Sequence, residues 1–212
     1  MPLAGDFSGR RRTSNVGLVV VLLASIAVFC TLPHPALAAI RGHAAGVRDG
    51  CADATISATI ASPRVMRNAV VCLVNYERAR YRLPGLSEVR KLNASAQSYT
   101  VEMVRRNFFS HTAPNGSTPG ARIAASGYRW SWAGENIASG YRTPLSVVTG
   151  WLHSQGHCYN MLAPAFRNIG VGVSPHPVGA ATVPATWTQD FGLPLGSHSP
   201  SRNWGPANSC PH

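Results

Sequence analysis

Acidic residues and lysine are scarce in this chain. Eight of its 212 residues are Asp or Glu, and Lys91 is the one lysine among nineteen basic residues, so the formal net charge is +11. The arginines are scattered, with no basic run in the middle of the chain. A contiguous phosphate-binding patch is therefore not evident, and we expect no nucleic-acid partner. Internal repeats are absent, and a hydrophobic content of 45% excludes wholesale disorder.

The first 38 residues have the order of a secretory signal peptide. Three arginines at 10–12 precede an uncharged, mostly apolar run at 16–32, and a small-residue A-x-A site follows at 36–38. Such a signal peptide would direct export of the chain, and its cleavage after Ala38 would remove Cys30. An uncleaved anchor is the alternative, because an apolar run of about 17 residues is near the lower limit for a membrane span. We expect a secreted, extracellular protein.

Four cysteines follow the expected cleavage site: Cys51, Cys72, Cys158 and Cys210. An even number of cysteines in an exported chain predicts two disulfides, and three pairings are open. We favour Cys51–Cys72, which closes a local loop, and Cys158–Cys210, which fastens the C-terminal tail. Free, buried thiols are the alternative.

The rest of the chain divides into a leader, one domain and a tail. Residues 39–61 lack periodicity and are expected to form a flexible leader, and residues 194–212 are a tail rich in Pro, Ser, Gly and Asn. Capping residues and apolar spacing predict helices over about 62–83, 88–107, 118–127 and 143–153. Short β-like runs lie at 169–173 and 186–191, with a third strand expected over 133–141. Helices beside a small sheet indicate one α+β domain over about 62–193.

Three polar residues are candidates for a shared site. His111 follows two aromatic residues at a helix exit, Glu135 lies in a small and apolar context where a carboxylate needs a partner, and His157 lies between a Gly and a Cys. No H-E-x-x-H zinc motif and no G-x-S-x-G element is present. Spacing alone therefore favours separate histidines bonded to the backbone and a structurally paired glutamate. Asn136 and Gln189 are expected to join neighbouring segments by hydrogen bonds.

The order of short motifs resembles the CAP superfamily, which comprises cysteine-rich secretory proteins, antigen 5 and pathogenesis-related 1 proteins. The secreted bacterial SCP-like branch is the most similar. The motifs that carry the resemblance are CLVNYERAR at 72–80, MVRRNFFSH at 103–111, GENIA at 134–138, WLHSQGH at 151–157, IGVGV at 169–173 and WTQDFG at 187–192. The resemblance implies a three-layer α-β-α sandwich with a small antiparallel sheet and a central cleft.

Members of this family typically line that cleft with two histidines and two glutamates. By the match of motifs, His111 and His157 are the histidines and Glu135 is the first glutamate. The second glutamate would stand three residues after Trp151, where this chain has Ser154. Two imidazoles and one carboxylate would suffice to hold Zn²⁺ or another divalent cation. The general base that a second carboxylate would supply is missing.

The leading functional hypothesis is a secreted, non-enzymatic and monomeric CAP-domain protein that binds a ligand or partner outside the cell. The resemblance suggests a lipid, a sterol or a cell-envelope component as the ligand. The alternative is a metal-dependent hydrolase or peptidase, in which Glu135 is a third metal ligand or the catalytic base. A third hypothesis is a passive envelope component whose basic surface holds it to acidic polymers.

Overall fold

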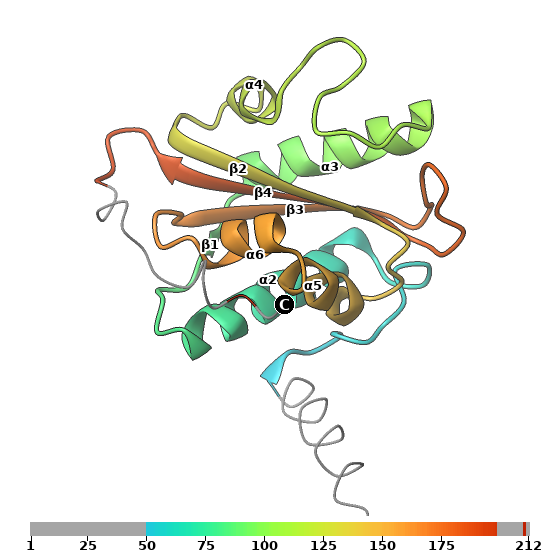
Figure 1. Cartoon of the computed structure of the whole chain (residues 1–212), viewed down its shortest axis with the longest axis horizontal. Helices are drawn as coiled ribbons and strands as arrows, with labels where there is room; N and C mark the ends of the chain where they lie inside the picture. The colour runs from blue at the N-terminus through green and yellow to red at the C-terminus, as the bar shows by residue number, and fades with distance from the viewer. Residues whose placement is uncertain (1–49, 199–209, 211–212) are drawn as a thin grey trace, which may run out of the picture. The chain divides into compact units, whose positions relative to one another are not determined.

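Four strands form one mixed sheet in the order β1-β3-β4-β2 (Figure 1). The structure is a computed structural model, and it describes residues 50–198 and residue 210. β1 (Ser87–Glu88) runs parallel to β3 (Asn168–Ser174). β4 (Thr186–Pro194) pairs antiparallel with β3 on one side and with β2 (Trp130–Ser139) on the other. The sheet is antiparallel, as expected, except for its two-residue edge strand.

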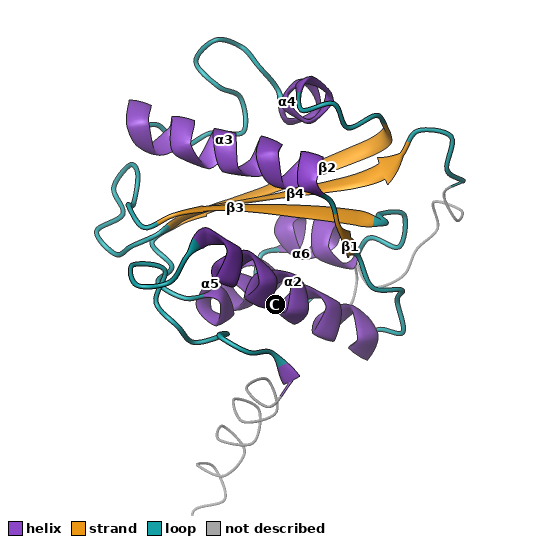
Figure 2. Ribbon diagram, turned by 180° about the vertical axis from the view of Figure 1, so that it is seen from behind, coloured by secondary structure: helices purple, strands orange, loops and turns teal. Residues whose placement is uncertain are grey.

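Helices cover both faces of this sheet, which gives the predicted three-layer sandwich (Figure 2). One face carries α2 (Pro63–Arg80), α5 (Pro144–Leu152) and α6 (Gln155–Leu162). The other face carries α3 (Arg90–Arg106) and the short α4 (Pro119–Ala125). None of the helices within residues 50–198 is long and apolar enough to cross a membrane.

Three of these helices begin where the sequence predicts. Ser62, Thr118 and Thr143 each stand before a proline, and each side chain accepts a hydrogen bond from a backbone N–H three residues later. A proline at the first helical position loses no intrahelical hydrogen bond, and its φ is already helical. A polar N-cap followed by Pro therefore fixes the first residue of α2, α4 and α5.

Two predictions about the elements of the domain need correction. The flexible leader expected over 39–61 is packed from residue 50 onward, because Cys51, Ala54 and Ala58 are buried in the main core. The backbone of Ala54 and Ala58 also bonds to residues 145 and 142, within and in front of α5. The sequence predicts no helix over 155–162, where α6 lies. The expected signal peptide at 1–38 and most of the tail lie outside the described residues.

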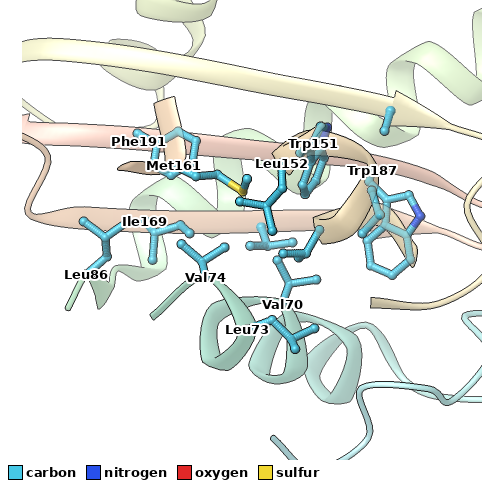
Figure 3. Close-up of a cluster of buried hydrophobic side chains, with 14 of the residues drawn as sticks. Val70, Leu73, Val74, Leu86, Trp151, Leu152, Met161, Ile169, Trp187 and Phe191 are labelled. Atoms are coloured by element: carbon cyan, nitrogen blue, oxygen red, sulfur yellow. The ribbon is translucent and has the colours of Figure 1, made fainter. Parts of the chain in front are cut away.

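The main hydrophobic core lies between the sheet and the layer of α2, α5 and α6 (Figure 3). Trp151 and Trp187 are its largest buried side chains, and α2 contributes Val70, Leu73 and Val74 at helical spacing. Apolar side chains spaced three and four residues apart share one helix face, so this stripe lies against β3 and α5. Smaller clusters around Tyr99 and Leu92 fill the space under α3.

The glycines of β3 explain how closely α3 packs against the sheet. A Cβ atom at Gly170 would lie 2.2 Å from the backbone of Leu92, and one at Gly172 would lie 2.4 Å from the backbone of Ala96. Real Cβ contacts are never so short, so only glycine permits this approach. The alternation of Gly and Val in this strand places glycine toward α3 and valine toward the main core.

Side chains of α3 also bond to the backbone of β3 beyond the end of β1. Asn93 Oδ1 accepts from the Val171 N–H at 2.9 Å. Gln97 bonds both backbone groups of Val173, with Oε1 accepting at 3.1 Å and Nε2 donating at 2.9 Å. These two amides continue the pairing that β1 begins along the same strand.

Two disulfides join the ends of the domain to its helices. Cys51 bonds to Cys72 in α2, and Cys158 in α6 bonds to Cys210. These are the two pairs that the sequence analysis favoured. Cys158 and Cys210 are both buried and belong to the main core.

Candidate functional site

Glu135 is the centre of a buried polar cluster. It lies in β2 with its side chain 2% exposed, and both carboxylate oxygens have a strong partner. His111 Nδ1 donates to Oε1 at 2.8 Å, and Arg122 Nη2 donates to Oε2 at 2.7 Å. The His111 side chain itself is 50% exposed, so its ring connects the buried carboxylate with solvent. A hydrogen bond to each oxygen fixes the Glu135 side chain in place.

Arg122, in α4, holds three parts of the site at once. Besides Glu135 it donates to the backbone carbonyls of His111 at 3.0 Å and Ser117 at 2.7 Å. Its guanidinium carbon lies 3.3 Å from the centre of the Tyr99 ring, a cation–π arrangement. The loop that carries His111 is therefore bound to α4 and, through Tyr99, to α3.

α6 is tied to β2 by asparagines, which brings His157 into the cleft. Asn160 Nδ2 donates to the Glu135 carbonyl at 3.1 Å and to Asn136 Oδ1 at 2.8 Å. Asn136 in turn donates to the His157 carbonyl at 3.0 Å and to Gln189 Oε1 at 3.1 Å. The expectation that Asn136 and Gln189 join neighbouring segments is confirmed.

His157 and Ser154 line a pocket of about 310 Å³ beside this cluster. Phe109, which is 47% exposed, and the buried Trp151 form part of its apolar wall. Burial, and then the neighbouring His111, lower the pKa of His157 below its usual value. His157 is therefore neutral at pH 7, with one ring nitrogen able to accept a hydrogen bond or a metal ion.

No carboxylate stands at the position of the second glutamate. Ser154 is the N-cap residue of α6, but its side chain makes no capping hydrogen bond. The adjacent His153 does not substitute for the missing carboxylate, because it is exposed and its Nδ1 donates to the Thr149 carbonyl at 2.8 Å. The structure thus brings His111 and Glu135 into direct contact and places His157 and Ser154 together on the neighbouring pocket.

Sequence reasoning missed Asp190, which belongs to the same buried cluster. Asp190 lies opposite Glu135 in the β2–β4 register and is 1% exposed. Burial, and then the charge of Glu135, raise the pKa of Asp190 well above its usual value, while Ser95 and Arg122 lower it in part. Neither Asp190 Oδ1 nor the Ser95 hydroxyl makes a hydrogen bond of good geometry. The signal that could have revealed Asp190 was an acidic residue within a predicted buried strand.

Arg122 was also missed, because nothing in the sequence near it marks a functional residue. It occupies the last turn of a short helix, in a chain with many scattered arginines. The signal that remains is indirect. Glu135 needs a buried cation, and the sequence offers eighteen arginines without indicating which one it is.

The predicted metal set is only partly present. Across residues 50–198 and residue 210, no three His, Cys, Asp or Glu side chains form a group that could hold a metal ion. Both Glu135 oxygens are occupied by His111 and Arg122, so this carboxylate orients His111 rather than offering a free ligand atom. A catalytic zinc centre needs three protein ligands and a water. The donor set of two imidazoles is one ligand short.

Comparisons with known proteins give one family. The model of the family described as "Cysteine-rich secretory protein family" (CAP) matches residues 71–191. The uncharacterized protein YkwD of Bacillus subtilis is 35% identical over 137 residues, which are 65% of this chain and 51% of YkwD. The uncharacterized membrane protein YlbC of the same organism is 30% identical over 104 residues, or 49% of this chain and 30% of YlbC. The chain thus spans about half the length of the first of these relatives.

Solved structures show the same architecture. An extracellular protein from Bacillus anthracis that contains an SCP domain is 29% identical, with a TM-score of 0.53 over 62% of this chain and 44% of that one. An outer surface protein from Borrelia burgdorferi is 21% identical, with a TM-score of 0.53 over 59% of this chain and 90% of that one. Because the Borrelia burgdorferi protein is only 21% identical, its similarity shows the fold alone. Both similar proteins are extracellular or outer-surface proteins.

Proposed function

Because the chain belongs to the cysteine-rich secretory protein (CAP) family, we propose that it is an exported, non-enzymatic protein whose cleft binds an extracellular ligand. Its ligand presents an apolar group to the pocket beside His157 and a polar group to His111. Lipids, sterols and cell-envelope components with an exposed apolar group have this chemistry.

The double pairing of Glu135 is the observation that carries the proposal. A general base must reach the proton that it abstracts. Both oxygens of Glu135 are engaged at 2.7 and 2.8 Å, and its side chain is 2% exposed. Ser154 stands where a second carboxylate would be, and a lone serine is not a base. The cluster therefore holds His111 in one orientation, as a binding site requires, and offers no free carboxylate base to a reacting water.

The pocket supports the apolar part of the ligand. Phe109 leaves nearly half of its surface exposed at the pocket, so its ring is available to contact an apolar ligand group. We also propose a weak position for a divalent cation at the two imidazoles of the polar end. His111 and His157 would hold the ion there, with Glu135 orienting His111, and the ion would supply a positive charge for a polar or anionic ligand group.

Ligand binding is tested on protein purified from an exporting host. We expect native mass spectrometry to show a co-purified apolar molecule, and a fluorescent sterol and a fluorescent fatty acid to bind with saturation. Phe109→Ala should weaken binding at least about tenfold, or about 1.4 kcal/mol, because it removes the exposed wall of the pocket. Leu195→Ala is the matched control, since Leu195 is 54% exposed and does not line this pocket.

Two results would contradict the proposal. Equal binding by the Phe109→Ala and Leu195→Ala proteins would place the ligand elsewhere. Chelator-sensitive hydrolysis of a peptide or ester, lost in Glu135→Gln while the fold is kept, would establish the hydrolase instead.

A further inference from the structure

A second and larger cavity lies between α3 and α4, away from the cleft pocket. Its volume is about 550 Å³, within the range of ligand pockets. None of its lining residues also lines the pocket beside His157. The proposed cleft ligand gives this cavity no role.

Side chains that form hydrogen bonds surround this cavity. Ser98 and Glu102 of α3 face it from one side, Asn115 and Ser117 from the loop before α4, and Ser126 from the end of α4. Small alanines of both helices lie between them and leave the space open. Hydroxyl and amide groups offer donors and acceptors together, interspersed with methyl groups.

Two residues in the lining have buried polar atoms whose hydrogen bonding is incomplete. Ser95 is 5% exposed, and its hydroxyl lies close enough to Asp190 to lower the pKa of that carboxyl but makes no hydrogen bond of good geometry. The buried Nε of Arg122 makes no hydrogen bond. Buried polar groups without partners are rare, and each one calls for an explanation. A serine hydroxyl both donates and accepts, so Ser95 can donate to Asp190 and still accept a hydrogen bond from a ligand in the cavity.

The charges in this cavity are already balanced. Arg122 is paired with Glu135 at 2.7 Å, and Glu102 is paired with Arg106 at 3.0 Å. An anion would meet the Glu102 carboxylate, and a cation would meet the Arg122 guanidinium. An acyl chain would desolvate the hydroxyl and amide groups and give them no hydrogen bond in return.

We propose that the cavity between α3 and α4 is a second ligand site, which binds a short, neutral, hydroxyl-rich saccharide. The ring hydroxyls bond to Ser95, Ser98 and Asn115, and the C–H faces lie against the alanines. Arg122 forms a wall of this site and also holds Glu135 and the His111 carbonyl, so it connects the two sites.

The test is a titration of the ¹⁵N-labelled full-length chain with two neutral trisaccharides, maltotriose and N,N′,N″-triacetylchitotriose. We expect at least one of them to shift the backbone amide signals of residues 94–102 and 115–126 with saturation, at a Kd of about 10 mM or tighter. Hexanoate and triglycine, which represent an acyl chain and a peptide, should not shift these signals.

Ala125→Trp fills the cavity from α4 and should weaken saccharide binding at least about tenfold. Ala124→Trp is the matched control, because Ala124 is exposed on the same helix and does not line the cavity. Its Kd should stay within about twofold of the parent value. Should Ala125→Trp fail to fold, Ser98→Phe fills the space from the exposed side of α3 and serves the same purpose.

The proposal is overturned if neither trisaccharide shifts the signals, or if shifts are confined to residues of the cleft. It is also overturned if hexanoate or triglycine binds in the cavity more tightly than the sugars, or if the filling variant binds as well as the control.

Discussion

Asp190 lies directly opposite Glu135 across the β2–β4 pair, so two carboxyl groups share one buried face of the sheet. Arg122 bonds to Glu135 at 2.7 Å and lies close enough to Asp190 to lower its pKa in part. One guanidinium cannot balance two buried carboxylates. Burial, and then the charge of Glu135, raise the pKa of Asp190 well above its usual value.

Replacing Asp190 by Asn should stabilise the protein at neutral pH. A raised pKa in the folded state gives a contribution that is present below the unfolded pKa, about 4, and is lost as pH rises through the folded pKa. Each unit of difference is worth about 1.4 kcal/mol, and Asn cannot ionise. Urea unfolding at pH 5 and pH 8 checks this. The gain of the variant should be larger at pH 8, and a gain that is independent of pH would refute the argument.

Removing the Arg122 side chain should be among the most damaging single changes. Arg122→Met leaves a carboxylate that is 2% exposed without its cation, and breaking a buried ion pair costs about 3–5 kcal/mol. Arg106→Met, which breaks an exposed pair with Glu102, should cost about 1 kcal/mol or less. Chemical denaturation of the two variants gives the comparison.

The double variant Arg122→Met, Glu135→Gln isolates the cause. If an unpaired charge is responsible, the second substitution recovers part of the loss. Additive losses would show instead that Arg122 acts mainly by packing on Tyr99 and by holding the loop that carries His111.

His157 should titrate below the usual range of histidine. Its pKa is lowered by burial and then by His111, so His111→Asn should raise the pKa of His157. A lowered pKa in the folded state gives a contribution that is present above the unfolded pKa, about 6.5, and is lost as pH falls through the folded pKa. Imidazole NMR signals followed from pH 4 to 8 measure the pKa. An unchanged pKa in His111→Asn would mean that burial alone causes the shift.

A methyl group at Gly170 should force α3 away from the sheet. The new Cβ would lie 2.2–2.5 Å from Leu92 and Asn93, and overpacking of a close contact costs about 1–3 kcal/mol. Gly156→Ala in α6 is the matched control, since no atom lies within 4 Å of its added Cβ. That change should stabilise the protein by up to about 1 kcal/mol, because alanine favours the helix. Thermal unfolding of both proteins distinguishes them.

The regular elements were predictable where local chemistry fixes them. Capping residues and prolines placed the starts of three helices, and the strands at 168–174 and 186–194 follow from their β-like composition. The helix over 155–162 was not predictable. It has little amphipathic pattern, and it is held by tertiary bonds such as those from Asn160 to β2. Packing against the sheet, rather than local propensity, determines this helix.

The candidate site was also predictable only in part. His111, Glu135 and His157 could be named because the family motifs carry them. Arg122 and Asp190 could not, because their roles depend on which residues the fold brings next to Glu135. The register Glu135↔Asp190 and the reach of Arg122 from α4 are properties of three-dimensional structure that no short motif records.

The bonds from Asn93 and Gln97 to the backbone of β3 have a consequence for the resistance of the sheet to aggregation. A bare strand edge invites other extended chains to add to the sheet and so promotes aggregation. Here the backbone groups of Val171 and Val173 at one edge are already taken by side chains of α3. At the opposite edge, the carbonyls of Glu135 and Ile137 are taken by Asn160 and Trp151. Fixed side chains thus occupy hydrogen-bonding positions that a stray strand would need at both edges of the sheet.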